Sequence, residues 1–195
     1  MPKRKPYDVA GAFVHVTTRG VRRARIYGDE FDYVGWLTIF ERTVKRFAWR
    51  CHAYCLMPNH FHLLIELVEP TLAVGMKHLN QSYAQRVNLR YERTGHVFEA
   101  PYDAKLVETE EHFVTACAYV VLNPVRAGLC ADPADWPWSS HRATAGLAHR
   151  PPYLVVDMLR GQFGRGAQAL QRYRDFVAAG ATSHDQVVGH AVRGQ

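Results

Sequence analysis

The pattern of hydrophobic and polar residues divides most of the chain into short alternating stretches and longer stretches of helical period. The alternating stretches are rich in β-branched and aromatic residues, as half-buried strands are. They span residues 12–18, 49–57, 61–68 and 102–108. The turn signal Pro58-Asn59 separates the middle two, which therefore predict a hairpin.

Three stretches of helical period lie between and after these strands. Asp29 is placed to cap the first, which runs to about Phe47 and carries an apolar stripe. Pro70 suits the first turn of the second helix, and Thr109 is placed to cap the third, which covers 110–123. Pro124 follows, and proline disfavours helical backbone in the residue before it, so we expect the third helix to stop there.

The order of these elements is β-α-β-β-α-β-α. It predicts an α+β fold with a ferredoxin-like β-α-β-β-α-β core, an antiparallel sheet and one added helix at 110–123. Residues 130–195 are turn-rich and aromatic at first, then helical on either side of Gly161–Gly166, and polar and loose from Gly180. We therefore divide the chain into a core domain, 1–129, and a mostly helical C-terminal appendage, 130–195, packed on that core.

Composition and charge favour a nucleic-acid partner. Hydrophobic residues make up 48% of the 195 positions, which is ample for a folded core. The formal net charge is +6, and 19 of the 24 basic residues are arginine, whose planar fork fits a phosphate with two hydrogen bonds. The same usage is also typical of an ordinary protein from a GC-rich genome, so charge alone does not decide.

Two histidines, His60 and His62, sit one residue apart in the segment LMPNHFHLLIE, at the start of the third predicted strand. Side chains alternate in a strand, so both imidazoles share one face while Phe61 and Leu63 point into the core. Neutral imidazole is a common metal ligand, so the pair can converge on one ion. The alternative is two half-exposed histidines on a solvated face.

The third predicted helix carries Tyr119 and Asn123, four residues apart and therefore on one face. Tyr119 is surrounded by alanine and valine, which also fits a plain core position. As a nucleophile its phenol would need a divalent metal and nearby arginines, because it is almost fully protonated at neutral pH. Asn123 would offer a third, oxygen ligand to a hard cation such as Mg²⁺ or Mn²⁺. Together with the histidine pair, this helix predicts a phosphoryl-transfer site.

Two motifs, MPNHFHLLIE at 57–66 and YVVLNPVRAGL at 119–129, stand about 50 residues apart. The segments HVTTRG at 15–20, GHVF at 95–98 and PWSS at 137–140 accompany them. Together they resemble the single-tyrosine HUH transposases, and more closely the REP-associated tyrosine transposases. The resemblance runs from about residue 8 to residue 147, which is most of the chain.

The resemblance implies roles for particular residues. His60 and His62 would be the metal ligands of the HUH motif, and Asn123 would complete the metal site. Tyr119 would attack a DNA phosphate, giving a 5′-phosphotyrosine link and a free 3′-OH. The family's substrate is single-stranded DNA, with repetitive extragenic palindromes folded as hairpins.

Basic residues that follow the first strand and the tyrosine motif are expected to contact DNA phosphates. They are Arg19, Arg22, Arg23 and Arg126. One segment departs from the family's pattern: where relatives read a basic segment such as QGRFK, this chain has Glu99-Ala100-Pro101-Tyr102-Asp103. Fewer phosphate contacts would weaken DNA binding and flatten its salt dependence. The departure leaves the predicted catalytic residues untouched.

Three other functions fit parts of the sequence. A zinc-stabilised DNA-binding protein would use the spacing C-x3-C-x4-H-x-H of Cys51, Cys55, His60 and His62, although both cysteines lie within a strand. A nucleotide phosphoesterase would need two HxT elements, and only HVT at 15–17 has that form. A domesticated family member would keep the fold and DNA binding as a regulator.

The remaining expectations concern location, assembly and supporting residues. The chain has no apolar run of membrane-spanning length, MPKRKPYDV lacks the apolar core of a signal peptide, and four cysteines form no disulfide framework, so we expect a cytoplasmic protein. The short last strand and the appendage favour a monomer. His15 and Glu66 are expected to support the metal face rather than to bind the ion, and Trp136 and Trp138 to anchor the appendage.

Overall fold

The computed structural model describes the backbone of residues 7–191 and the side chains of residues 7–181. Four strands form one antiparallel sheet in the order β2-β3-β1-β4. The strands are β1 (Phe13–Arg19), β2 (Trp49–Met57), β3 (His60–Leu67) and β4 (Asp103–Val107). The predicted α+β fold with a ferredoxin-like sheet is therefore confirmed, and β2 and β3 form the predicted hairpin.

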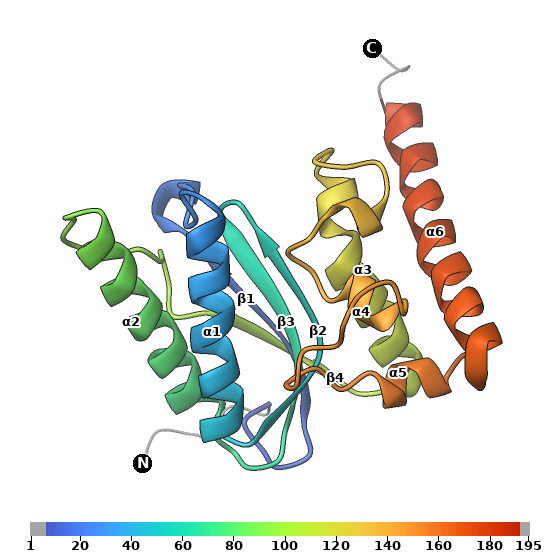
Figure 1. Ribbon diagram of the computed structural model, residues 1–195, viewed down its shortest axis with the longest axis horizontal. Helices are drawn as coiled ribbons and strands as arrows, with labels where there is room; N and C mark the ends of the chain where they lie inside the picture. Colours follow the sequence, from blue (N-terminus) through green and yellow to red (C-terminus); the bar gives the residue numbers. More distant parts are fainter. Residues whose placement is uncertain (1–6, 192–195) are drawn as a thin grey trace.

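Helices cover both faces of the sheet. The helices α1 (Glu30–Arg46) and α2 (Leu72–Arg90) lie on one face, and α3 (Glu110–Arg126) and α6 (Gly166–Ala191) lie on the other (Figure 1). On the first face, Trp36 of α1 and Tyr83 of α2 share a buried core with Phe61 of β3. On the second face, Leu64 of β3 is buried against α3 and α6. Alternate residues of β3 thus face different helix layers, as its sequence predicts.

Two helices begin at their predicted capping residues. The Asp29 carboxylate accepts a hydrogen bond from the Asp32 backbone N–H at the start of α1. The Thr109 hydroxyl accepts one from the His112 backbone N–H at the start of α3. Each bond satisfies a backbone donor that the first turn of a helix leaves without an intrahelical partner.

The predicted end of the third helix is wrong. Pro124 lies inside α3, which continues to Arg126. Proline has no N–H for the Val120 carbonyl, but the side-chain amide of Asn123 donates to that oxygen at 3.3 Å and to the Tyr119 carbonyl at 2.8 Å. Gly128, two residues after the end of the helix, has a φ of +68°, the left-handed conformation typical of the residue that follows a helix C-terminus.

The expectation of a loose segment from Gly180 is wrong as far as Ala191, and residues 192–195 lie outside the part of the chain that the structure describes. The last helix, α6, runs through this glycine to Ala191. A Cβ atom at Gly180 would stand 3.0 Å from Cδ1 of Leu122 on α3, so the glycine permits close helix packing instead of ending the helix. No helix within residues 7–191 is both long and apolar enough to cross a membrane.

The segment after α3 covers the outer edge of β2. It contains the short helices α4 (His141–Thr144) and α5 (Asp157–Gly161). The Trp136 indole donates to the Leu56 carbonyl at 3.0 Å, and the Trp138 ring stacks on Tyr33 with centroids 4.5 Å apart. Both tryptophans therefore anchor this segment as predicted, and they cover a strand edge that would otherwise be open to pairing. The division at residue 129/130 stays a prediction.

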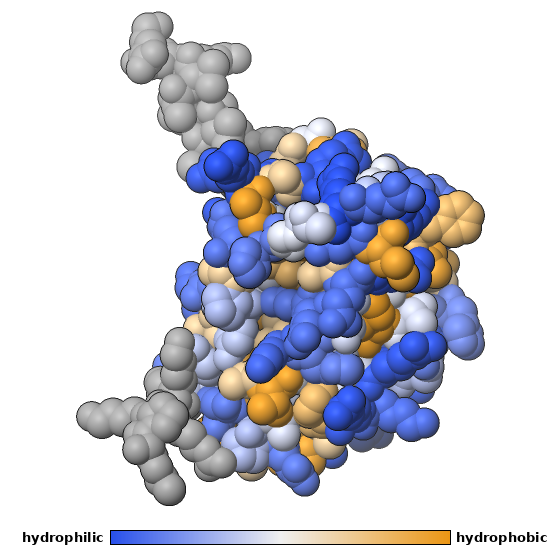
Figure 2. Space-filling view, turned by 90° about the vertical axis from the view of Figure 1, so that its left-hand side faces the viewer, coloured by the Kyte–Doolittle hydropathy of each residue, from blue (hydrophilic) through white to orange (hydrophobic). Residues whose placement is uncertain are grey.

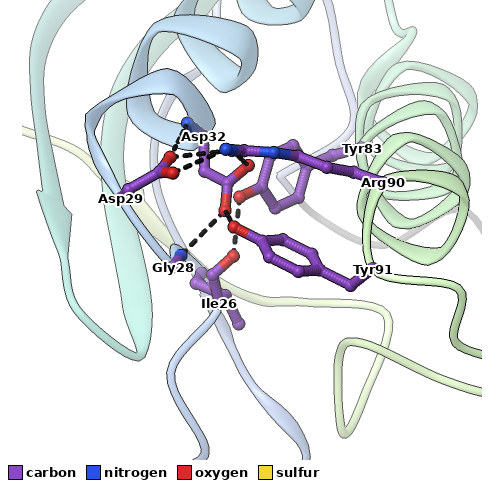
Figure 3. Close-up of polar contacts among 7 residues, drawn as sticks. All are labelled: Ile26, Gly28, Asp29, Asp32, Tyr83, Arg90 and Tyr91. Atoms are coloured by element: carbon purple, nitrogen blue, oxygen red, sulfur yellow. Dashed lines mark hydrogen bonds and ion pairs between the residues drawn. The ribbon is translucent and has the colours of Figure 1, made fainter.

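A network of charged and polar groups ties the start of α1 to the end of α2 (Figure 3). The Asp32 carboxylate is fully buried and accepts hydrogen bonds from Arg90, from the Tyr91 hydroxyl and from the Gly28 backbone N–H, at 2.6 to 2.8 Å. Arg90 also pairs with the Asp29 carboxylate at 2.5 Å. These contacts hold the end of the loop between β1 and α1, which carries three arginines.

We expect Asp32→Ala to lower the melting temperature by about 5 °C or more. The substitution leaves Arg90 and Tyr91 without their buried acceptor, and removing one partner of a buried ion pair is strongly destabilising. Thermal unfolding followed by circular dichroism would measure the change. Glu30→Gln is the matched control, since it removes an exposed acidic group in the same first turn of α1. Equal melting temperatures for the two variants would contradict this role of the network.

Candidate active site

The pairing of β1 with β3 places polar side chains of the two strands side by side. Thr17 stands opposite His62, and Arg19 stands opposite His60. His15 lies on the same face, because it is two residues from Thr17 along β1. This is the face that α3 covers, and the other face of β3 is buried under α1 and α2.

His62 is almost completely buried, with 6% of its surface exposed. Its Nδ1 atom lies 3.0 Å from Nε2 of His15 and 3.1 Å from Oγ1 of Thr17. Its Nε2 atom is buried and has no hydrogen-bond partner. His60 is held differently: its Nδ1 atom lies 2.6 Å from Oδ1 of Asn59. One ring nitrogen of each histidine is thus oriented by a neighbour, as is typical of metal-binding histidines.

The three imidazoles at this site are uncharged at neutral pH. Burial lowers the pKa of His62 to about 2, and the nearby His15, His60 and Arg19 add to the effect. Burial likewise lowers the pKa of His60 and of His15 to about 4. A neutral imidazole keeps a lone pair for a metal ion, so the site favours the ligand form of these residues.

The helix α3 brings Tyr119 against the imidazoles of His62 and His15. Its ring meets the His62 ring edge-on, with centroids 5.9 Å apart, and the His15 ring in the same way at 5.7 Å. The guanidinium of Arg126 lies 4.8 Å from the centre of the Tyr119 ring. Tyr119 is 43% exposed, so it is not the core residue that its neighbours in the sequence allow. A half-exposed phenol beside His62 is accessible to a phosphate.

Asn123 lies one turn after Tyr119, where the sequence places it. Its side-chain nitrogen donates to carbonyls of α3, so its amide oxygen is the atom that would serve as a ligand. Within the part of the chain that the structure describes, no three His, Cys, Asp or Glu side chains form a metal-binding group. A site built on His60 and His62 therefore needs a third ligand of another type, which an asparagine fits. The ligand role of Asn123 stays a prediction.

A pocket of about 360 Å³ lies between β1, β4 and α3, and it contains residues that the sequence did not single out. His62 and Tyr119 line it, together with Asp103 and Lys105 of β4. Alternation along β4 points Ala104 toward the core of α1 and α2 and leaves these two charged residues on the pocket side. The alternation was visible in the sequence, but the pairing of β4 with β1 was needed to place Lys105 opposite His15.

Three of the predicted phosphate-binding arginines lie on β1 and the loop that follows it. Arg19 lines the pocket, 4.0 Å from the Glu99 carboxylate. Arg22 and Arg23 both have positive φ, at 53° and 59°, which is uncommon for residues other than glycine and often marks functional sites. The Asn59 amide donates to the Arg23 carbonyl at 3.1 Å, so this loop is fixed beside the turn that precedes His60.

A second, larger groove of about 1180 Å³ adjoins the pocket. It runs between α2 and residues 95–102 and shares Glu99, Ala100 and Tyr102 with the first pocket. Arg22 and Lys77 supply positive charge to its walls. Figure 2 shows the face on the α2 side, where hydrophilic residues surround separate apolar patches.

The prediction that Glu66 supports the metal face is wrong, and the cysteines of the zinc alternative also lie away from the pocket. Glu66 lies at the far end of β3, where its carboxylate binds Arg50 at 2.8 Å and His52 at 3.3 Å, so it supports the strand and not the pocket. Cys51 and Cys55 are buried in the two different cores on either side of the sheet. Burial raises the pKa of both thiols, which disfavours the thiolate form that zinc needs. The described residues thus do not form the predicted zinc alternative.

Comparison with known families identifies the class of protein. Residues 8–123 match the family described as "Transposase IS200 like". The matched segment is more than half of the chain and contains both histidines, Tyr119 and Asn123. The chain belongs to the IS200-like transposase family.

The predicted resemblance to REP-associated tyrosine transposases is confirmed. The chain is 23% identical, over 124 residues, to a Haemophilus influenzae protein named "Putative REP-associated tyrosine transposase", covering 57% of this chain and 70% of that protein. The fold of this chain matches that of a solved REP-associated tyrosine transposase bound to a REP hairpin, with a TM-score of 0.64 and 14% identity. That match covers 81% of this chain and 93% of the solved one.

Proposed function

We propose that this protein cleaves and rejoins single-stranded DNA through a covalent link between Tyr119 and a 5′ phosphate, with Mg²⁺ or Mn²⁺ as cofactor. One observation carries the proposal. A half-exposed tyrosine ring stands edge-on against His62, whose Nε2 atom is buried without a partner. An orphaned nitrogen of a neutral imidazole fits a metal ligand, and a tyrosine beside it fits a nucleophile.

In the proposed reaction the Tyr119 oxygen attacks phosphorus, and the bond between phosphorus and the 3′ oxygen breaks. The phenol proton passes to solvent, and the departing 3′ oxygen takes up a proton. Attack by a 3′-OH on the phosphotyrosine reverses these steps and rejoins the strand. His60, His62 and Asn123 would hold the metal ion, which supplies polarisation of the phosphate.

The chain's own cations would hold the scissile phosphate while Tyr119 attacks. Lys105 and Arg19 line the pocket that contains Tyr119. Arg126, predicted to contact a DNA phosphate, holds its guanidinium over the Tyr119 ring, and its phosphate contact stays a prediction. A cation is attracted to the face of an aromatic ring, so this contact helps to hold the Tyr119 ring in place for the attack.

We expect Lys105→Gln to slow strand cleavage about ten- to a hundredfold and to leave hairpin affinity nearly unchanged. Removing one charged donor from a phosphate in the reaction pocket costs transition-state stabilisation more than binding. Single-turnover cleavage and a gel-shift titration would measure the two quantities. Lys45→Gln removes an exposed lysine in the last turn of α1 and should cleave as the wild type does. Lys105 has no such role if the two variants cleave at one rate.

We further propose that the substrate is a palindromic hairpin of the REP type and that the protein acts as a monomer. The similar solved protein is bound to a REP hairpin. The groove beside the pocket has basic and aromatic walls, which suit the unpaired nucleotides next to a hairpin stem. Tyr119 and His62 meet within one chain, so one protomer carries both halves of the site. Such a substrate fits the cytoplasmic location predicted from the sequence.

The experiment is incubation with single-stranded hairpin DNA and Mn²⁺, followed by denaturing electrophoresis. We expect a covalent protein–DNA band that EDTA abolishes, and peptide mapping should find the adduct on the peptide that contains Tyr119. Hairpin binding in a native gel without any covalent band would overturn the proposal. That result would support the DNA-binding regulator instead.

A further inference from the structure

His15 contacts two of the residues that the proposed reaction depends on, His62 and Tyr119. Its Nε2 atom lies 3.0 Å from Nδ1 of His62, and the two rings are stacked with centroids 5.2 Å apart and planes 21° apart. The edge of the same imidazole meets the ring of Tyr119 at 5.7 Å. The next strand neighbour on the same face, Thr17, reaches only the His62 side chain.

The short distance between the two imidazoles couples their protons. At 3.0 Å the two nitrogens are at hydrogen-bond distance, so one hydrogen lies between Nε2 of His15 and Nδ1 of His62, and one ring donates while the other accepts. If His15 donates, the hydrogen of His62 must sit on Nε2. That atom is buried with no partner, so this arrangement would bury an unsatisfied N–H group.

The opposite arrangement leaves His62 ready for a metal ion. When His62 donates from Nδ1, both His15 and Thr17 are placed to accept, at 3.0 and 3.1 Å. The Nε2 atom of His62 then carries a lone pair that faces no protein donor. A neighbour that accepts from the far nitrogen of a ligand histidine fixes its tautomer and ring orientation.

We propose that His15 is a positioning residue that holds His62 as the Nδ1–H tautomer, with Nε2 free for the metal ion, and that packs the Tyr119 ring beside it. The inference rests on the proposed function, because it assigns His62 as a metal ligand. His15 itself binds no metal: it acts through the hydrogen bond that it accepts and through its ring.

Two substitutions of His15 separate the effect of the hydrogen bond that it accepts from the effect of its aromatic ring. Phenylalanine keeps an aromatic ring against His62 and Tyr119 but accepts no hydrogen bond, whereas glutamine offers an acceptor oxygen without the ring. We therefore expect His15→Phe to weaken Mn²⁺ binding about 10- to 100-fold, as loss of an outer partner does at other metal sites. His15→Gln should retain most of the Mn²⁺ affinity.

Isothermal titration of the purified full chain with MnCl₂, without DNA, measures this affinity. Thermal unfolding without metal confirms that each variant is folded, and His149→Gln, an exposed loop residue, is the control that should bind Mn²⁺ as the wild type does. Long-range ¹H–¹⁵N NMR of the metal-free protein reads the tautomer of His62 directly. We expect the proton on Nδ1 in the wild type and a mixture of tautomers in His15→Phe.

The outcomes separate this inference from the proposed function. If His62→Ala loses Mn²⁺ binding and folded His15→Phe keeps it, the positioning role is wrong and the metal site stands. If His15→Gln loses as much affinity as His62→Ala, His15 is a ligand, which also overturns the proposal. A wild-type protein that binds no Mn²⁺, or binds it equally well without His62, would instead refute the metal site of the proposed function.

Discussion

Tyr119→Phe is expected to bind hairpin DNA with the affinity of the wild type and to form no covalent adduct. The substitution removes only the phenolic oxygen, while the ring keeps its contacts with His15, His62 and the Arg126 guanidinium. We expect the cleavage rate to fall by at least about a thousandfold, because no other group replaces a missing nucleophile. Denaturing gels of single-turnover reactions would measure the loss.

Tyr102→Phe is the matched control for this experiment. Tyr102 is the other tyrosine that lines the same pocket among the described residues. Burial raises the pKa of Tyr102 to about 12, which makes its phenol a poorer nucleophile at neutral pH. We expect this variant to form the adduct. An adduct that survives in Tyr119→Phe and disappears in Tyr102→Phe would mean that the nucleophile is assigned to the wrong residue.

His62→Ala is expected to abolish cleavage while leaving the fold and hairpin binding in place. The side chain supplies the buried Nε2 atom that would bind the metal ion, so cleavage in Mn²⁺ should fall at least about a hundredfold. His60→Ala should behave in the same way. The surrounding sheet is held by the buried residues on the other face of β3, which neither substitution touches.

Three measurements together test this second prediction. Circular dichroism reports the fold, a native gel shift reports hairpin binding, and the covalent band on a denaturing gel reports cleavage. His78→Gln on α2, whose ring lies beside Phe47 on the other side of the sheet, is the control and should cleave normally. Full cleavage by His62→Ala in Mn²⁺ would show that the ion, if used at all, is held elsewhere.

Much of the fold could be predicted from the sequence because its signals are local. A strand with one face against a core must alternate, so the order of residues in β3 already separated Phe61 and Leu63 from His60 and His62. Capping residues likewise marked the starts of α1 and α3. Pro124 misled the prediction because its effect depended on a side-chain bond from Asn123, which no backbone rule contains.

The candidate site was predictable only in part, because local sequence signals place residues within one element but not across elements. Spacing within one element places His60 beside His62, and Asn123 one turn after Tyr119, without knowledge of the rest of the chain. Contacts between elements depend on strand register and helix placement, which the sequence does not state. The neighbours of each predicted residue therefore had to come from the structure.

The sequence by itself determined which residues are candidates for the proposed chemistry: two histidines on one strand face and a tyrosine on a helix, set by the periods of strand and helix. Only the tertiary structure decided what surrounds them. The pairing of β1 with β3 brought His15 within 3.0 Å of His62, and the pairing of β1 with β4 brought Lys105 into the pocket. His15 and His62 are 47 positions apart, and His15 and Lys105 are 90 positions apart (105 − 15). They lie side by side because antiparallel pairing joins distant segments, which the local sequence pattern does not specify.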